Sequence, residues 1–300
     1  LNYFWLSLKK MSVIIGIVLA FGAMLCWGFG DFFIQKSTRK LGDWEALFLV
    51  ALFGVVILTP FVYKDISSIF SLNLGFFLLL SASLILFIAA LLDFEALKRG
   101  KLSIIEPVWS FEIPISALLA FFIMSERISV YQIILIVTLV LGLVLVSLKS
   151  EHFNKKAWFE KGVLIAFLAA IIMGVANFFV GWGARETSAL VVNWFFHIFI
   201  ALACFFYIIF NRSPRALLQD IKRNKAILVG MCLLDNIAWV AFAFSMVLAP
   251  IAVAVALSES YIVIAVLLGM YVNREFVRKH QKLGIVIAVI SAIILVYITI

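Results

Sequence analysis

The stretch Gly28-Phe-Gly-Asp-Phe-Phe33 returns in altered form as Gly174-Val-Ala-Asn-Phe-Phe179, 146 residues further along the chain. A second pair keeps nearly the same offset, because Trp44 and Trp194 are 150 residues apart. Each of these segments lies inside a long apolar run. The sequence therefore predicts two related halves, each built from apolar segments in the same order.

A third pair of residues supports the same repeat. Glu126 and Glu275 are 149 residues apart, and each follows an apolar run. Small loop insertions account for the few residues by which the three offsets differ. We place the first repeat at residues 11–148 and the second at residues 162–300.

The composition indicates a membrane protein. Hydrophobic residues make up 66% of the 300-residue chain and charged residues 13%, whereas soluble domains carry about 25% charged residues. A soluble fold would leave much of this apolar surface facing water. The net charge of +8 does not indicate nucleic acid, because the basic residues lie in short gaps between apolar runs. We predict an all-α integral membrane fold.

The apolar runs can be counted, since a membrane-spanning helix needs about 20 mostly apolar residues. We read ten transmembrane helices, five in each half. Five is an odd number, so the second half enters the bilayer from the opposite side and the halves are inverted repeats. Inverted repeats are a common plan of transporters, whose solute sites lie near the midplane. The predicted spans are 12–33, 44–63, 74–97, 102–124, 130–148, 162–183, 188–210, 226–248, 250–272 and 281–300.

The basic residues are distributed unevenly between the two sides. Nineteen of the 24 lysines and arginines lie in the gaps after the first, third, fifth, seventh and ninth predicted helices. The other five are Lys9, Lys10, Lys64, Arg127 and Arg185. Cytoplasmic loops of membrane proteins carry the excess of Lys and Arg, so this bias predicts a cell-membrane protein with both termini outside.

Several motifs resemble the drug/metabolite transporter superfamily, and specifically its EamA-type members. They are the segment Ala96-Leu-Lys-Arg-Gly100, the prolines of the fourth predicted helix, and Ser125-Glu-Arg-Ile-Ser129 after that helix. The second half carries a weaker version in Pro250 and the segment Asn273-Arg-Glu-Phe276. The resemblance extends over nearly the whole chain.

This resemblance implies a basket of helices around a central cavity. The cavity would be lined mainly by helices 1, 3, 4, 6, 8 and 9, with the fifth helix of each half on the outside. It also implies transport of small metabolites and termini in the cytoplasm. The charge bias predicts the opposite orientation, and we give it more weight.

Carboxylates inside the predicted spans are the first candidates for a solute site. A charge in the bilayer costs several kcal/mol unless it meets water or a partner, and few basic residues lie at the same depth. We expect these acids to face a hydrated cavity or to carry protons, and to bind a cationic or zwitterionic solute. For Asp31 and Asp93 a position among the headgroups is equally favoured. The candidates are Asp31, Asp93, Glu106, Glu112, Asp235 and Glu259.

The fourth predicted helix is the most informative segment. Glu106, Trp109 and Glu112 recur at a spacing of three, which spreads them over about 120° of the helix. Pro107 and Pro114 each remove a backbone donor, and such a helix is tolerated where it faces protein or a water-filled cavity. We therefore predict that this helix lines the site.

Two aromatic–acid pairs suggest how an amine could be held. Asp235 and Trp239 are four residues apart and share a helix face, and Trp27 and Asp31 repeat that spacing. A carboxylate beside an aromatic ring binds an amine by charge and cation–π attraction. A tryptophan of the interfacial belt is the alternative for each ring.

Other polar residues receive structural interpretations. Glu126 is expected to pair locally with Arg127, and His197 to be a hydrogen-bonded packing residue, with a proton relay as its alternative. The segment Arg215–Lys225 is expected to be a solvated loop, with a short amphipathic helix on the membrane surface as the alternative. The three cysteines are far apart and no clustered His/Cys set occurs, so we predict no cofactor and no metal.

The leading hypothesis is a secondary transporter that moves a small amine-bearing or zwitterionic metabolite by alternating access, with proton coupling as an option. The expected partners are this solute and the lipid bilayer, without nucleic acid, and a homodimer stays open. The alternative is a membrane-embedded enzyme acting on a lipid-linked substrate, which predicts a polar site at one membrane surface. A receptor or scaffold without solute flux is a third class.

Overall fold

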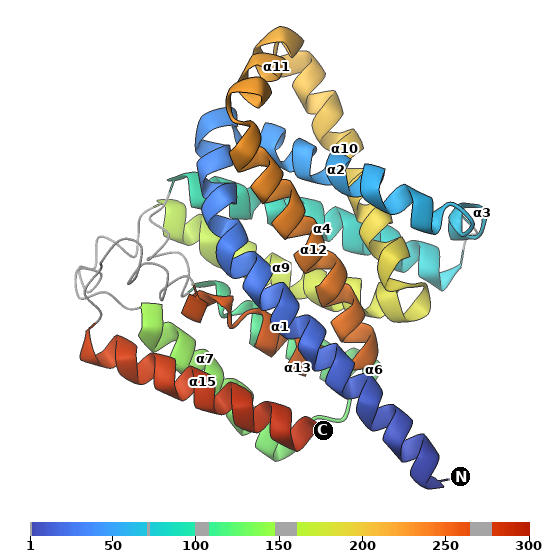
Figure 1. Ribbon diagram of the computed structural model, residues 1–300, viewed down its shortest axis with the longest axis vertical. Coiled ribbons are helices and arrows are strands. Elements are labelled where there is room, and N and C mark those ends of the chain that lie inside the picture. Colours follow the sequence, from blue (N-terminus) through green and yellow to red (C-terminus); the bar gives the residue numbers. More distant parts are fainter. Residues whose placement is uncertain (1, 71–72, 100–107, 148–160, 265–277) are drawn as a thin grey trace.

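The chain folds as a bundle of helices in the computed structural model shown in Figure 1. The structure describes residues 2–70, 73–99, 108–147, 161–264 and 278–300, and these residues contain no strand. The helices are α1 (Asn2–Leu41), α2 (Asp43–Val62), α3 (Ile66–Ile69), α4 (Leu74–Arg99), α6 (Glu112–Met124), α7 (Val130–Ser147), α9 (Lys161–Glu186), α10 (Ala189–Asn211), α11 (Pro214–Arg223), α12 (Lys225–Leu248), α13 (Ile251–Ser258) and α15 (Lys279–Thr299).

Seven helices of the described chain are long and apolar enough to cross a membrane: α1, α2, α4, α9, α10, α12 and α15. Three shorter apolar helices, α6, α7 and α13, lie where the other three spans are predicted. Residues 102–107 of the fourth predicted span and 265–272 of the ninth lie outside the described residues. The seven long apolar helices and the three shorter ones confirm the predicted all-α membrane fold.

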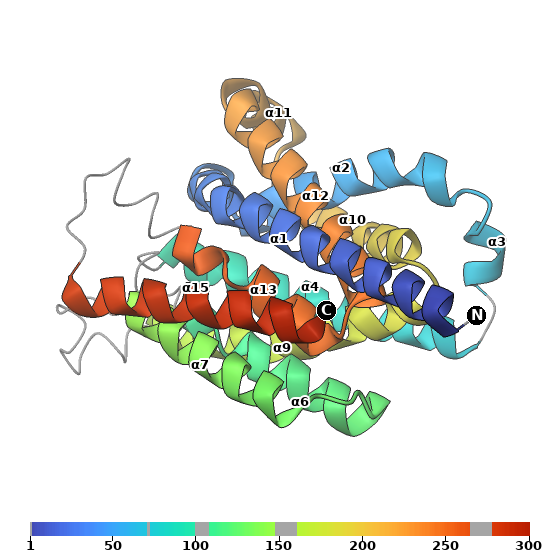
Figure 2. The ribbon, with the colours of Figure 1, turned by 60° about the horizontal axis from the view of Figure 1, so that its bottom comes forward.

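The main helix pairs join one half of the chain to the other. α1 packs on α12, α4 on α9, α2 on α10, α6 on α13, and α7 on α15. Figures 1 and 2 show the last pair side by side along one edge of the bundle. Because each half packs its helices against the other half, the two halves share one hydrophobic core.

The two tryptophans singled out in the sequence occupy related places in the α2–α10 pair. Trp44, at the start of α2, stacks on Tyr207 near the end of α10, with ring centroids 3.9 Å apart. Trp194, near the start of α10, donates its indole N–H to Thr59 Oγ1 near the end of α2, at 2.9 Å. The two helices are therefore antiparallel. Each tryptophan lies near the start of its own helix and contacts a residue near the end of the other helix.

The α7–α15 pair is also joined by reciprocal contacts. Gln132, in the first turn of α7, donates to Thr299 Oγ1 at the end of α15, at 3.1 Å. Gln281, in the first turn of α15, donates to the carbonyl of Val146 at the end of α7, at 2.9 Å. Gln132 and Gln281 are 149 residues apart, the offset already found for the sequence repeat.

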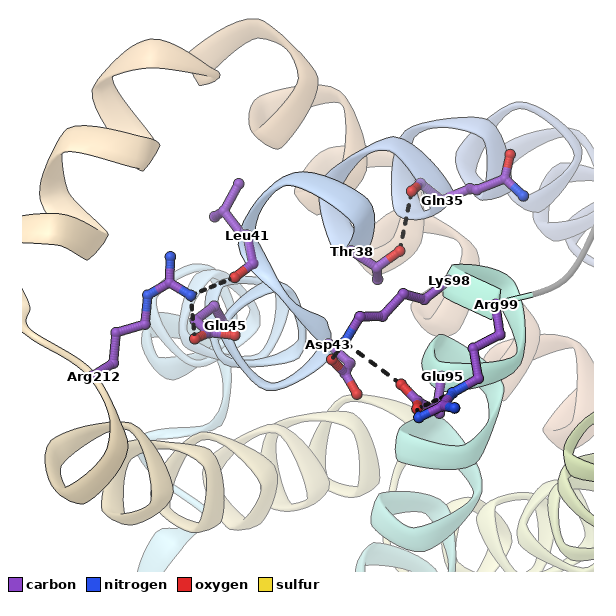
Figure 3. A network of polar contacts seen from close by, with 9 residues as sticks. All are labelled: Gln35, Thr38, Leu41, Asp43, Glu45, Glu95, Lys98, Arg99 and Arg212. Atoms are coloured by element: carbon purple, nitrogen blue, oxygen red, sulfur yellow. Dashed lines mark hydrogen bonds and ion pairs between the residues drawn. The ribbon is translucent and has the colours of Figure 1, made fainter. Parts of the chain in front are cut away.

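One end of the bundle gathers the gaps after α1, α4 and α10, and we call it the basic end (Figure 3). Lys98 of α4 bonds Asp43 of α2 at 2.7 Å. Arg212, after α10, donates to the carbonyl of Leu41 at 2.7 Å and to Glu45 at 2.8 Å. These contacts place three of the Lys- and Arg-rich gaps side by side.

The opposite end is closed by an ion pair between the halves. Arg185, in the last turn of α9, bonds Glu126 at 2.9 Å and the carbonyl of Ala249 at 2.9 Å. Glu126 also accepts the backbone N–H of Ile251 at the start of α13, at 3.0 Å. The prediction that Glu126 pairs with Arg127 is wrong, because its partner comes from a helix 59 residues further along the chain.

Of the two alternatives for Arg215–Lys225, the solvated loop is wrong and the short helix is found. Residues Pro214–Arg223 form α11, with Pro214 in the first turn, where a missing N–H costs nothing. Leu217 is buried and Ile221 packs against the core. An apolar stripe spaced by four residues gives this short segment a surface to bind to, and that stabilises it as a helix.

We expect the substitution Gly284→Ala to destabilise the bundle. A Cβ there would lie 2.6 Å from the backbone N of Val146 and 2.7 Å from the carbonyl O of Gly142. Backbone atoms cannot rotate away, so the cost of overpacking is about 1–3 kcal/mol. The measurement is the thermal unfolding midpoint in detergent.

The control is Gly22→Ala, which makes the same chemical change within a helix. A Cβ at Gly22 meets no atom within 4 Å, and alanine favours the helix over glycine. A midpoint that falls equally in both variants would contradict the close α7–α15 contact.

Candidate solute site

A cavity of about 90 Å³ lies among the helices, toward the basic end of the bundle. By this measure a water needs about 10–15 Å³, so the cavity has room for several waters or for the polar head of a small solute. Seven of the eight residues predicted from the sequence line it, and the eighth, Glu106, lies outside the described residues. The seven are Asp31, Asp93, Trp109, Glu112, Asp235, Trp239 and Glu259.

The two helices that carry the glutamates are interrupted beside the cavity. Before α6, the N–H of Phe111 bonds back to the carbonyl of Val108, three residues earlier. After α13, the N–H of Ser260 bonds back to the carbonyl of Leu257, again three residues earlier. Phe111 and Ser260 are 149 residues apart, so the tight turns occupy corresponding positions in the two halves. Such mid-helix tightening is typical of functional sites.

These turns place a carboxyl group from each half at the cavity. Glu112 follows the first turn and Glu259 lies in the second, and both are buried. α1, α4 and α12 contribute Asp31, Asp93 and Asp235. Asp31 is 8% exposed and lines the cavity together with Asp93.

The carboxyl groups are close enough to act on one another. Asp31 interacts electrostatically with Asp93 and Asp235, and Glu259 interacts with Glu112, Asp93 and Asp31. The described residues that line the cavity include no lysine or arginine. Five acids that share one small space repel each other when ionised, so the cavity attracts protons or a cationic group.

Neutral side chains hold three of the acids in place. The amide of Asn177 donates to Glu112 Oε2 at 3.0 Å, and the indole N–H of Trp27 donates to Asp235. The hydroxyl of Tyr261 donates to Asp31. These donors orient the carboxyl groups without cancelling their charge.

Aromatic rings form one wall of the cavity. Trp239 makes edge-on contacts with Trp27 at 5.3 Å, with Phe196 at 5.4 Å and with Phe242 at 5.9 Å between ring centroids. Such pairs prefer edge-to-face geometry, which fixes the position of each ring. A fixed aromatic face beside carboxyl groups is suited to an ammonium group.

His197 is both packed and at the cavity. It is 2% exposed, and its Nδ1 lies 2.7 Å from the carbonyl O of Asn193. A carbonyl only accepts, so Nδ1 carries the hydrogen in this bond and Nε2 is the acceptor nitrogen. His197 is therefore a hydrogen-bonded packing residue, as the sequence predicted, and it also lines the cavity.

Sequence reasoning missed Asn177 as a site residue. Asn177 corresponds to Asp31 in the repeated motif that links 28–33 to 174–179. Both residues line the cavity, so the repeat itself carried the signal. An uncharged amide did not stand out, because only charged side chains were treated as costly in the membrane.

Below the cavity, toward the opposite end, the bundle is dry and closely packed. Every residue of α13 is at most 1% exposed. α1 approaches this region closely, since a Cβ at Gly16 would lie 3.0 Å from the Cβ atoms of Leu248 and Ala249. α13 therefore forms a seal of about 12 Å between Glu259 at the cavity and the Glu126–Arg185 ion pair.

A second cavity of about 480 Å³ lies at the opposite end, between α3, the start of α4 and the α9–α10 junction. Its polar lining includes Asp65, Asn73 and Glu186, but none of the residues predicted for the solute site. In the part of the chain that the structure describes, no group of three or more His, Cys, Asp or Glu side chains is placed to hold a metal ion.

Comparisons with known proteins agree with this architecture. A sequence model of the EamA-like transporter family matches the chain twice, at residues 14–148 and 160–297, and this confirms the resemblance found in the sequence. No curated protein sequence matches the chain. One solved structure, described only as the crystal structure of a protein, is 16% identical, covers 95% of this chain and 97% of its own, and has a TM-score of 0.74. That likeness concerns the fold alone.

We expect a cysteine at position 90 to react faster with a cationic thiol reagent than with an anionic one. Ala90 lines the cavity, and an acid-lined cleft concentrates cations, so the ratio of rates should be about tenfold or more. The measurement uses Ala90→Cys in a chain whose Cys26, Cys204 and Cys232 are replaced, with ethylammonium and ethylsulfonate methanethiosulfonates.

The control is Ala226→Cys, an exposed position next to Lys225 at the basic end. Its preference should be reversed. Equal rates for both reagents at position 90 would show that the carboxyl groups do not control the charge of the cavity.

Proposed function

The chain belongs to the EamA-like transporter family, and from this premise we propose that it carries a small amine-bearing or zwitterionic metabolite across the membrane. In this proposal ten transmembrane helices form two inverted five-helix repeats, at residues 11–148 and 162–300. The solute binds between the halves, and alternating access moves it from one side to the other.

The observation that carries the proposal is the set of five carboxyl groups on one cavity without a described lysine or arginine. An ammonium group satisfies these acids by charge and by hydrogen bonds. The rings of Trp27, Trp109 and Trp239 supply an apolar and cation-attracting surface beside it. Glu106 is proposed as a further member of the site from the sequence alone.

Alternating access requires a cavity that opens to one side at a time. The seal formed by α13 supports this, because a solute in the cavity cannot pass toward the opposite end while α13 keeps its present packing. Glu126 joins α6 of the first half to α9 and α13 of the second. Opening this end requires that the Glu126–Arg185 ion pair separates.

Proton coupling follows from the same cavity. When the ammonium group leaves, five acids remain together, and protons from water neutralise part of their charge. A proton and a solute then compete for the same carboxyl groups, which is the requirement for exchange. A membrane-embedded enzyme is less well supported, because the acids gather inside the bundle instead of at a membrane surface.

We expect Asp235→Asn and Glu259→Gln each to reduce solute flux to the background of empty liposomes. Both side chains face the cavity, and each substitution removes one negative charge from the site. The solute is first chosen by a thermal-shift screen of the purified chain against amines, amino acids and neutral metabolites. Flux is then measured in proteoliposomes.

The matched control is Glu186→Gln, an exposed acid at the end of α9, which should leave flux unchanged. Normal yield and unfolding temperature of the two cavity variants would show that insertion is intact. Unchanged flux in both cavity variants would refute the assignment of the site.

We further propose that the basic end faces the cytoplasm and that both termini lie outside. Reporter proteins fused to the two termini test this orientation, with a fluorescent protein that matures in the cytoplasm and an alkaline phosphatase that is active outside. Phosphatase activity is expected at both termini. Fluorescence at both would mean that the charge bias misleads and that the orientation usual for the family applies.

A further inference from the structure

The short helix α11 has two unlike faces. It connects α10 to α12 at the basic end, where Figure 1 shows it at the top of the bundle. Leu217 and Ile221 face the hydrophobic core. Arg215, Lys222 and Arg223 are exposed, and their helical positions, at 100° per residue, place them on the opposite side of α11 from these two residues.

The acids at this end are already paired. Asp43 bonds Lys98, Glu95 bonds Arg99, and Arg212 bonds both Glu45 and Asp220 (Figure 3 shows all of these residues except Asp220). The exposed cations of α11 therefore have no acidic partner among the described side chains. They leave the basic end with uncompensated positive charge directed away from the bundle.

The lengths of the neighbouring helices set the depth of α11 in a bilayer. α10 has 23 residues and α12 has 24, which makes each about 35 Å long at 1.5 Å per residue. The hydrocarbon core of a bilayer is about 30 Å thick. Helices of this length bring α11 to the level of the lipid headgroups.

Apolar side chains next to α11 fit the same position. Leu218, at the boundary between the two faces, is 57% exposed, and Phe210 at the end of α10 is 82% exposed. Leucine and phenylalanine in contact with water cost free energy, whereas at the edge of the acyl region they are buried. A helix that lies in the membrane interface has apolar residues on the side of the acyl chains and basic residues on the side of the headgroups and water.

We propose that α11 is a binding surface for anionic phospholipid, and that bound lipid stabilises the protein. The headgroup phosphates accept hydrogen bonds from Arg215, Lys222 and Arg223, and Leu218 enters the acyl boundary. A soluble acidic protein would satisfy the cations but would leave Leu218 and Phe210 in water. This inference does not depend on the solute or on the transport cycle.

The experiment measures the thermal unfolding midpoint of the full chain in detergent, titrated with phosphatidylglycerol or with phosphatidylcholine. Phosphatidylglycerol should raise the midpoint at lower concentration, and the difference should shrink as salt is added. In the double variant K222Q/R223Q, the apparent affinity for phosphatidylglycerol should fall about twenty-five-fold, because each basic residue near an anionic surface contributes a factor of about five.

The matched control is K64Q/R127Q, which removes two exposed basic residues at the opposite end and should keep the lipid response. An equal loss in both variants, or equal responses to the two lipids, would overturn the proposal. Inorganic phosphate that reproduces the shift would also overturn it, since a free anion would then suffice. If K222Q/R223Q does not fold, R215Q is titrated with the same lipids and should also show a weaker response to phosphatidylglycerol. The unaltered chain should lose its preference for phosphatidylglycerol as salt is added, and a preference that salt does not change would overturn the proposal.

Discussion

The cost of an ionised carboxylate in hydrocarbon governs the centre of this molecule. Each of the five described acids is acceptable only beside water, a proton, a cation or a neutral donor. The chain meets this constraint by grouping the acids around one cavity, by interrupting the helices next to Glu112 and Glu259, and by supplying donors from Asn177, Trp27 and Tyr261. The polar site and the breaks in regular helix structure therefore have one physical cause.

The shared core has a mechanical consequence for how the halves can move. α1 packs on α12 and α4 on α9, so the first helix of each half lies against the third helix of the other half. Close contacts such as that of Gly284 with the backbone at Val146 leave no room for small local adjustments. Motion between the halves must therefore shift whole helices, and the tight turns at Phe111 and Ser260 are places where a helix can bend.

Much of the fold could be predicted from the sequence, because span length and apolar composition are strong signals. The depth of Asp31 was not decided, since an error of a few residues in a helix boundary moves a side chain from the headgroups to the interior. Arg185 was missed as the partner of Glu126 because pairing across 59 residues leaves no local pattern. Asn177 carried no charge to reveal it. For α11 the sequence offered both a helix and a loop, because ten residues are too few for the apolar pattern to decide between them.

The dry packing of α13 also has an electrical consequence. Membrane voltage falls mainly across the regions of a protein that exclude water and mobile ions. Between the cavity at Glu259 and the end of the bundle at Glu126, α13 is such a region, with every residue at most 1% exposed. A charge that crosses most of an energised bilayer changes in free energy by about 2.3 kcal/mol per 100 mV. A cation that passes this insulating layer thus performs or absorbs electrical work there, and the membrane potential acts directly on that step.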